Sequence, residues 1–382
     1  MTTPDPRELF IGLMSGTSLD GVDGVLARLP ATGGLQVLTH AHRPMPEALR
    51  ATLLALNSPG ADELHHAALA ANALTRLQAQ VVDELLARAG LPAREIRAIG
   101  SHGQTVRHRP GEFDGLGYTL QLNQPALLAE LTGIDVAHDF RPRDLAAGGQ
   151  GAPLVPAFHA LVFGRATEHR AVLNLGGIAN LTLLPPAAAH STAPDGPVTG
   201  FDCGPANALL DGWCQRHLGT AYDAAGRWSA GGQVHATLLA RCLAEPFFAR
   251  RPPKSTGRDL FHEGWLAARL DGLTLVPQDV QATLAELSAQ AAAQALRREA
   301  PHCAQLLVCG GGALNDDLMA RLRRALPGLP VRSTDSQGLP PLQVEAAAFA
   351  WLASALCRRV PASLPEVTGA RGPRLLGSLT PA

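Results

Sequence analysis

The sequence has very little lysine and carries almost no net charge. Lys254 is the only lysine among 32 basic residues, and the formal net charge of the 382 residues is −1. A chain without an excess of positive charge offers no basic field to nucleic acid or to an anionic membrane surface. We therefore expect a small-molecule partner, no nucleic acid and no membrane.

Long apolar runs and cysteine motifs are also missing. No uninterrupted apolar stretch approaches the roughly 20 residues that a membrane span needs, and residues 1–10 lack a charged segment followed by an apolar one. The six cysteines form no CxxC pair and have no neighbouring histidines at zinc-site spacing. These absences predict a cytoplasmic protein with reduced thiols. The 46% hydrophobic and 17% charged content is typical of a globular fold.

Two common nucleotide-binding motifs are absent, but a glycine-rich hairpin is present. The sequence has no GxxxxGK[ST], and no GxGxxG leads into a helix. Instead, residues 10–26, FIGLMSGTSLDGVDGVL, predict a strand, a small-residue turn and a returning strand. Backbone N–H groups at Gly16 and hydroxyls beside it suit a phosphate, and Asp20 and Asp23 supply oxygen ligands that Mg²⁺ prefers. An ordinary hairpin with a solvated acidic corner fits the same residues.

Polar side chains follow two further strands expected in the first half. One strand ends at His102 and Gln104, and another leads into Arg141 and Asp144. Ligands of α/β sheets usually bind beyond the carboxyl ends of strands, so these residues are site candidates. Guanidinium groups suit carboxylates and phosphates. The alternatives are a structural histidine and a solvated ion-pair cluster.

The second half repeats the strand, turn and strand pattern. Residues 171–184, AVLNLGGIANLTLL, predict a second hairpin with Gly176 and Gly177 at its turn. A later strand delivers Asp202 into a glycine and proline turn, and an apolar strand ends in three glycines at 310–312. Bare backbone at such a turn lets a flat ring or a sugar approach closely. The repetition predicts two lobes of similar topology.

These patterns predict an α/β protein with an N-terminal lobe at residues 1–142 and a C-terminal lobe at residues 143–382. A terminal helix at 344–358 has Glu345 as its lone carboxylate. We expect that this helix and the tail after it pack back on the first lobe.

The order of the motifs resembles the phosphate and adenosine segments of the superfamily of sugar kinases, heat-shock ATPases and actin. More narrowly, ten stretches in order resemble the anhydro-N-acetylmuramic acid kinase family across nearly the whole chain. They include GLMSGTSLDGVD (12–23), GSHGQTVRH (100–108), GFDCGPANALLD (200–211), PKSTGRDLF (253–261) and LVCGGGALN (307–315).

The resemblance implies two ribonuclease-H-like lobes with an ATP cleft between them, and a homodimer. It implies an enzyme of cell-wall recycling that converts 1,6-anhydro-N-acetylmuramic acid, ATP and water to N-acetylmuramic acid 6-phosphate and ADP. Asp202 is its expected catalytic base, and Mg²⁺ is assigned to Asp20 or Asp23. The expected ATP contacts are Gly16, Thr17, Ser18, Leu19, Asp20, Gly21, Val22, Asp23, Gly176, Gly177, Asn180, Gly204, Gly310, Gly311 and Gly312. The expected sugar contacts are His102, Gln104, Arg141, Asp144 and Glu345, with Arg141 or Arg143 at the lactyl carboxylate.

The chain departs from the family pattern at three positions. Pro142 replaces the middle arginine of a common run, Ala206 stands where glycine is usual, and Met14 lies near the place of the superfamily's metal-binding aspartate. Two other functions remain open: a superfamily kinase that phosphorylates an ordinary hexose hydroxyl, and a non-catalytic, ATP-gated sugar sensor. Asp202 weighs against the sensor, because binding alone does not need a carboxylate there.

Overall fold

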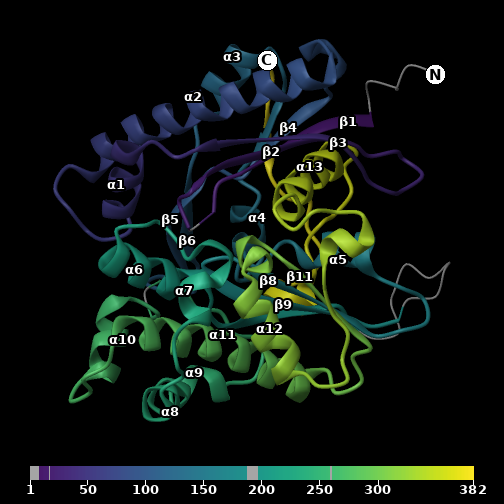
Figure 1. Ribbon diagram of the computed structural model, residues 1–382. Coiled ribbons are helices and arrows are strands. Elements are labelled where there is room, and N and C mark those ends of the chain that lie inside the picture. Colours follow the sequence, from purple (N-terminus) through teal and green to yellow (C-terminus); the bar gives the residue numbers. More distant parts are fainter. Residues whose placement is uncertain (1–7, 17, 187–196, 259) are drawn as a thin grey trace. The chain divides into compact units, whose positions relative to one another are not determined.

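The computed structural model describes residues 8–16, 18–186, 197–258 and 260–382, which form two compact units (Figure 1). Unit 1 contains Met1–Val162 and Leu342–Ala382, and unit 2 contains Phe163–Pro341. The chain therefore leaves unit 1 after Val162, whereas the sequence placed the boundary after residue 142. Residues 143–162 belong to unit 1, and residues within this segment form hydrogen bonds inside that unit. Residues 342–382 belong to the same unit.

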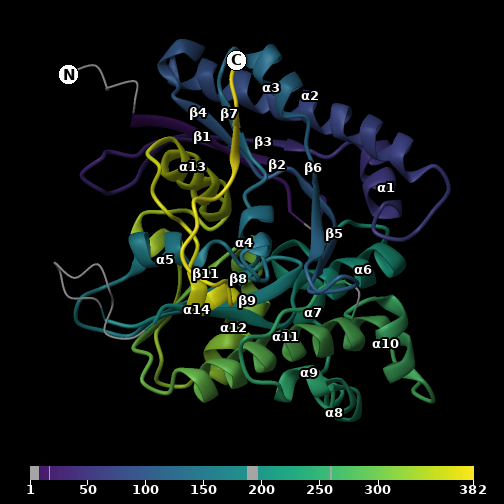
Figure 2. The same ribbon diagram turned by 180° about the vertical axis from the view of Figure 1, so that it is seen from behind.

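Unit 1 is built on a sheet with the strand order β13-β7-β4-β1-β2-β3. Strand β1 pairs antiparallel with β2, which pairs antiparallel with β3, whereas β4 and β7 continue parallel to β1. The short β13 closes the edge against β7, which Figure 2 shows from behind. A separate hairpin pairs β5 with β6. The strands are β1 (Leu9–Met14), β2 (Gly21–Arg28), β3 (Gln36–Pro44), β4 (Ala98–Ser101), β5 (Gln104–Pro110), β6 (Gly117–Leu122), β7 (Val136–His138) and β13 (Ser378–Thr380).

Helices cover both faces of this sheet. The long α2 carries buried Leu74, Val81 and Leu85 at helical spacing, packs against β2 and β3, and ends at the left-handed Gly90. On the other face α13 lies against β1 and β4. The helices are α1 (Glu47–Ala55), α2 (Glu63–Ala89), α3 (Pro125–Thr132), α4 (Pro142–Ala146), α5 (Pro156–Phe163), α13 (Val344–Cys357) and α14 (Pro365–Thr368).

Unit 2 repeats the plan of unit 1. Its sheet has the order β10-β9-β8-β11-β12, with antiparallel β8-β9 and β9-β10 pairs and parallel β8-β11 and β11-β12 pairs. The order and directions match β3-β2-β1-β4-β7 of unit 1. The expectation of an α/β chain with two ribonuclease-H-like lobes is therefore confirmed. The strands are β8 (Arg170–Leu175), β9 (Ile178–Leu184), β10 (Thr199–Pro205), β11 (Gln305–Cys309) and β12 (Val331–Ser333).

One face of the unit 2 sheet packs on α11 and α12 through an alanine- and leucine-rich core. A second apolar cluster lies where the same α11 meets α6, α8 and α10. The helices are α6 (Asn207–Leu218), α7 (Arg227–Ala230), α8 (Ala236–Leu243), α9 (Pro246–Ala249), α10 (Glu263–Leu270), α11 (Pro277–Glu299) and α12 (Asp316–Ala325), with short 3₁₀ turns at Ala224–Gly226, Gly311–Leu314 and Thr334–Gln337. Unit 1 has a similar turn at Ala93–Glu95.

Candidate active site

In unit 1, side chains from the ends of three strands form one buried polar set. Ser15 follows β1, His102 and Gln104 follow β4, and Arg141 follows β7. The Ser15 hydroxyl donates to Oε1 of Gln104, and Arg141 Nη2 donates to Nε2 of His102 at 2.8 Å. The parallel strands β1, β4 and β7 end at the same sheet edge, so residues far apart in sequence meet there.

The hydrogen bonds of His102 fix its tautomer. A guanidinium is only a donor, so Nε2 accepts from Arg141, and Nδ1–H donates to the Ser15 carbonyl at 3.2 Å. Burial, with the charge of Arg141 as a second cause, lowers the pKa of His102 to about 3. His102 is therefore neutral at physiological pH and orients Arg141 without competing for an anionic ligand.

Asp144, expected at the sugar, contacts the same loop residue, Gly151, as Arg141 does. Its fully buried carboxylate accepts from the Gly151 N–H and from the Thr368 hydroxyl, both at 2.8 Å. The Gly151 carbonyl in turn accepts from Arg141 Nη1 at 2.9 Å. Asp144 thus ties the C-terminal tail to the loop that holds Arg141.

Glu345 lies at the same edge because α13 runs antiparallel to β1. At one end of the helix Arg358 donates to the Leu29 and Pro30 carbonyls, near the start of β1. At the other end a Cβ on Gly12 would overlap the Ala346 carbonyl oxygen. The first turn of α13, which carries Glu345, is therefore near the carboxyl end of β1.

Some residues of the first glycine hairpin are buried in the core of unit 1, and others lie in the turn between β1 and β2. Leu19 and Val22 are buried core side chains, and a Cβ on Gly21 would overlap the Arg43 carbonyl of β3. Gly16 and Ser18 lie in the turn. There the Leu19 N–H donates to the Gly16 carbonyl at 3.2 Å, and the Ser18 hydroxyl donates to Asp20 at 2.9 Å. Thr17 lies outside the described residues, and the turn residues Gly16, Ser18 and Asp20 are the candidates for ligand contact in this hairpin.

The two metal candidates differ in their surroundings. Oδ1 of Asp23 lies 3.1 Å from His40 Nε2 and 3.1 Å from His42 Nδ1, across the β2-β3 pair. Burial acts to raise the pKa of Asp23, but these hydrogen bonds outweigh it and lower the pKa. Asp23 is thus held by two imidazoles, whereas Asp20 is exposed. Within residues 8–16, 18–186, 197–258 and 260–382, no group of three or more acidic, histidine or cysteine side chains is arranged to hold a metal ion.

In unit 2 the two glycine turns meet at the end of β8. The Gly176 carbonyl accepts from the Asn207 N–H at 3.0 Å, so the β8-β9 turn joins the start of α6. Gly310 has φ +77°, and a Cβ there would overlap Oδ1 of Asn174. Gly312 packs equally closely on Leu175. The sequence thus places glycine where β11 turns across the end of β8.

A row of polar side chains crosses this sheet beside the turns. Asn174 pairs with Asn180 across β8 and β9, and Asn180 pairs with Asp202 across β9 and β10. Directly opposed residues share a face, and this face is opposite the one that packs on α11 and α12. Among the described residues, Oδ1 of Asn174 and Oδ1 of Asn180 are buried without a hydrogen-bond partner. Asn174 was not among the site residues expected from the sequence, although it alternates with apolar residues along its strand.

Asp202 is held by a loop that runs along the outer edge of β10. Its N–H donates to the Lys254 carbonyl at 3.1 Å, and its Oδ2 accepts from the Thr256 N–H at 2.9 Å. A β-bulge follows between Asp202 and Gly204. A Cβ on Gly204 would lie 2.5 Å from the Phe248 ring, so Gly204 accommodates Phe248 and its glycine does not indicate an approaching nucleotide.

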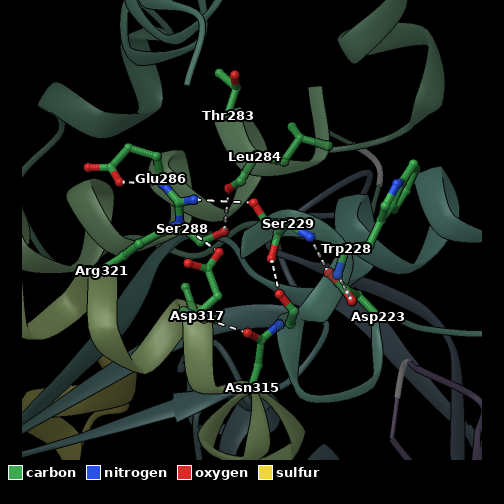
Figure 3. A network of polar contacts seen from close by, with 12 residues as sticks. Asp223, Trp228, Ser229, Thr283, Leu284, Glu286, Ser288, Asn315, Asp317 and Arg321 are labelled. Atoms are coloured by element: carbon green, nitrogen blue, oxygen red, sulfur yellow. Dashed lines mark hydrogen bonds and ion pairs between the residues drawn. The ribbon is translucent and has the colours of Figure 1, made fainter. Parts of the chain in front are cut away.

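A buried network of polar contacts joins α12 to α7 and α11 (Figure 3). Asn315, which follows the triple-glycine turn, accepts from the Leu318 N–H at 2.9 Å and caps α12. Further along α12, Arg321 pairs with Glu286 at 2.9 Å and with Asp317 at 2.8 Å. Arg321 is 5% exposed, so this cation is desolvated and paired. An open cavity of about 460 Å³ beside α6 and α10 contains none of the expected site residues.

Two sheets of equal strand order, each with polar side chains and glycine turns at the carboxyl ends of its strands, define a two-lobed ribonuclease-H-like protein. The family model for anhydro-N-acetylmuramic acid kinase matches residues 8–382. The chain therefore belongs to that family, and the expectations of this family and of a kinase are confirmed.

Individual relatives agree with the family match. The chain is 61% identical over 377 residues to the anhydro-N-acetylmuramic acid kinase of Variovorax paradoxus strain S110, with 98% of this chain and 99% of the relative covered. It is 62% identical over 381 residues to that of Bordetella petrii, with 99% and 97% covered. Among solved structures, a Rhodospirillum rubrum xylulose kinase is 16% identical, covers 90% of this chain and 89% of its own, and has a TM-score of 0.42.

Proposed function

We propose that this chain converts 1,6-anhydro-N-acetylmuramic acid, ATP and water to N-acetylmuramic acid 6-phosphate and ADP, in the recycling of cell-wall sugars. The full-length family match supports the reaction. The observation that carries the mechanism is the Asp202 carboxylate, held by the Thr256 N–H at the end of the row formed with Asn174 and Asn180.

The substrate is an internal glycoside, and its chemistry explains why one carboxylate suffices. Water forms a bond to C1 while the C1–O6 bond breaks, and O6 leaves with the electron pair. Inverting glycosidases protonate such a leaving oxygen with a second carboxylic acid. Here O6 bonds to the γ-phosphorus of ATP, and ADP leaves. Phosphoryl transfer thus replaces protonation.

Asp202 is the proposed general base of this reaction. It accepts the proton that the attacking water loses, and a positioned base of this kind contributes on the order of 10²–10⁴ in rate. The Thr256 N–H restrains Oδ2, which leaves the carboxylate in one orientation. Asn180, next to Asp202 across the strands, is the proposed polar neighbour of the phosphates.

The glycine turns are the proposed contacts of ATP. Gly176, Gly177 and the backbone at 310–312 lie together in unit 2, while Gly16 and Ser18 lie in the unit 1 hairpin turn. Backbone N–H groups in such turns suit phosphate oxygens. A Mg²⁺ ion bound together with ATP would offset the negative charge of the phosphates. The exposed Asp20 fits the single carboxylate that such an ion needs, whereas the histidine-bound Asp23 does not.

The unit 1 set is the proposed sugar site. Gln104, His102 and Glu345 suit hydroxyl and N-acetyl groups. Arg141, oriented by neutral His102, is favoured over Arg143 for the lactyl carboxylate because its guanidinium is already held in place. Asp144 acts through Arg141 and does not itself contact the sugar. We also propose a cytoplasmic homodimer, which the family resemblance supports and light scattering of the purified chain tests.

None of the helices in the described part of the chain has the length and apolar character required to cross a membrane.

The reaction is tested by comparing two sugars. Purified protein with ATP and Mg²⁺ is expected to release ADP with 1,6-anhydro-N-acetylmuramic acid, and to leave N-acetylmuramic acid with its ring already open largely unphosphorylated. Asp202→Asn is expected to lose ring opening and phosphorylation together. Equal phosphorylation of the open sugar, or a near-normal rate in Asp202→Asn, would contradict the proposal and favour a plain sugar kinase. No turnover of any sugar would favour a sensor.

A further inference from the structure

Lys254, the only lysine in the chain, anchors the loop that holds Asp202. Its backbone carbonyl accepts from the Asp202 N–H, and two residues later the Thr256 N–H donates to the Asp202 carboxylate. The loop therefore binds Asp202 on both its main chain and its side chain. The position of the carboxylate depends on what holds residues 254–256.

The side chain of Lys254 contacts α9. Nζ donates to the Phe247 carbonyl at 3.2 Å and lies 4.5 Å from the centre of the Phe247 ring. The Phe201 ring, next to Asp202 on β10, is 6.0 Å from the same nitrogen. A cation over an aromatic face is attracted by the ring, more so when it is partly desolvated. The partly buried ammonium is thus bound by α9 through a carbonyl and an aromatic ring.

We propose that Lys254 is a positioning residue for Asp202: its ammonium, held by the Phe247 carbonyl and ring, fixes residues 254–256 and thereby the carboxylate. This inference rests on the proposed function, in which Asp202 is the base. Lysine suits the place because one compact cation with a long apolar stem spans from the edge of β10 to the end of α9. The inference gives a role to the single lysine of a chain in which all the other lysine or arginine positions are arginine.

Arg298 offers a matched control on the same side of α9. This exposed residue of α11 donates to the Phe248 and Arg250 carbonyls at 3.1 and 3.2 Å, and pairs with Glu299. These bonds of Arg298 involve neither Lys254 nor Thr256, the two residues that bind Asp202. Arg298→Gln thus removes a neighbouring cation and two bonds to α9, and leaves the Lys254 anchor intact.

The first measurement is hydrogen exchange at the Thr256 amide of the full chain. Lys254→Met keeps the stem and removes the ammonium, and is expected to speed this exchange at least about tenfold, since the amide is protected through its bond to Asp202. Arg298→Gln is expected to leave the rate within about twofold. Unchanged exchange in Lys254→Met would overturn the inference.

The second measurement is catalytic. Lys254→Met is expected to lower kcat about 10- to 100-fold and to leave the KM of both substrates within about threefold, because a misplaced base affects the chemical step. Lys254→Arg is expected to recover part of this loss. Equal loss in Lys254→Met and Arg298→Gln, or a loss confined to KM, would overturn the inference.

A third measurement does not require a folded Lys254→Met variant. Lysine labelled with ¹⁵N at Nζ gives one side-chain signal in this chain. Burial lowers the pKa of Lys254, and the charged side chains that act on it are Arg298, Glu299 and Asp202. Asp202→Asn is expected to lower the pKa further, and Arg298→Gln to raise it. A signal that responds to neither change would overturn the inference. If the pKa of Lys254 shifts as expected in both variants but the wild-type chain has no sugar kinase activity, the proposed function is wrong. The contact between Lys254 and α9 is then still supported.

Discussion

Arg141 donates to Nε2 of His102 at 2.8 Å, and this contact makes a buried histidine a permanent hydrogen-bond acceptor. The pairing aligns the Arg141 guanidinium through a neutral imidazole, which adds no charge of its own. A guanidinium held in this way suits the carboxylate of the lactyl group of the proposed sugar.

The neutrality of His102 predicts a pH dependence of folding. Burial lowers its pKa to about 3, whereas an unfolded histidine titrates at 6.5. Between these values the unfolded chain binds more protons, so the stabilising contribution is complete above pH 6.5 and is lost as the pH falls toward 3. One such histidine costs about 2 kcal/mol at pH 5 relative to pH 7.5. His102→Gln is expected to reduce the difference in unfolding free energy between these two pH values.

The control for this prediction is His65→Gln, which changes an exposed histidine. Denaturant unfolding at both pH values measures the effect. His159 is also buried, with its pKa lowered to about 3 by burial, so half of the combined pH dependence is expected to remain in His102→Gln. An unchanged pH dependence would show that His102 is not neutral in the native state.

Gly12 determines how closely α13 approaches β1. A Cβ there would overlap the Ala346 carbonyl, so Gly12→Ala is expected to destabilise the fold by about 1–3 kcal/mol or more. The shift of α13 also moves Glu345, and we expect a raised sugar KM. Gly212→Ala is the matched control, because α6 leaves open space at Gly212 and a helical alanine is favoured by roughly 0.5–1 kcal/mol. Equal thermal stability of the two variants would contradict the close packing.

Asp20 and Asp23 are expected to respond differently to substitution. Asp20→Asn is expected to raise the Mg²⁺ concentration needed for half-maximal activity several-fold, and Asp23→Asn to leave it unchanged. The hydrogen bond with Asp23 raises the pKa of His42 against the opposing effect of burial, so Asp23→Asn should lower that pKa. Magnesium titration of activity and NMR titration of His42 test both parts. A Mg²⁺ shift in Asp23→Asn alone would reverse the assignment.

Arg321 joins two carboxylates in the network of Figure 3. Arg321→Met leaves Glu286 and Asp317 without their cation, and breaking a buried pair in this way costs about 3–5 kcal/mol. The exposed Arg324 on the same helix provides the control, and Arg324→Met is expected to change stability by less than about 0.5 kcal/mol. Denaturant unfolding of both variants measures the difference. Similar values for the two would show that the network is not stabilising.

Local patterns in the sequence were sufficient for the hairpins and the terminal helix. Apolar residues around two glycine turns predicted β1-β2 and β8-β9, and the helix expected at 344–358 is α13. These sequence patterns are informative because each of these elements buries the apolar residues that recur along it.

Features that depend on contacts between distant residues could not be predicted. The boundary after Val162, which the sequence placed after residue 142, is not marked by any change in local composition. Asp23 is held by His40 and His42 only through the β2-β3 register, and Asp144 is satisfied by Thr368 from the tail. Gln104, expected in a loop, begins β5 because it pairs with Leu122. The partners named in this paragraph lie at least 17 positions away along the chain.

Coupled ring opening and phosphoryl transfer is the central claim, and ¹⁸O-labelled water tests it most directly. The purified chain is incubated with 1,6-anhydro-N-acetylmuramic acid, ATP and Mg²⁺ in labelled water, and the sugar product is analysed by mass spectrometry. The account predicts one ¹⁸O at C1 and one phosphate on the same molecule, and neither in Asp202→Asn. Phosphate on a sugar whose anhydro ring is intact would contradict it.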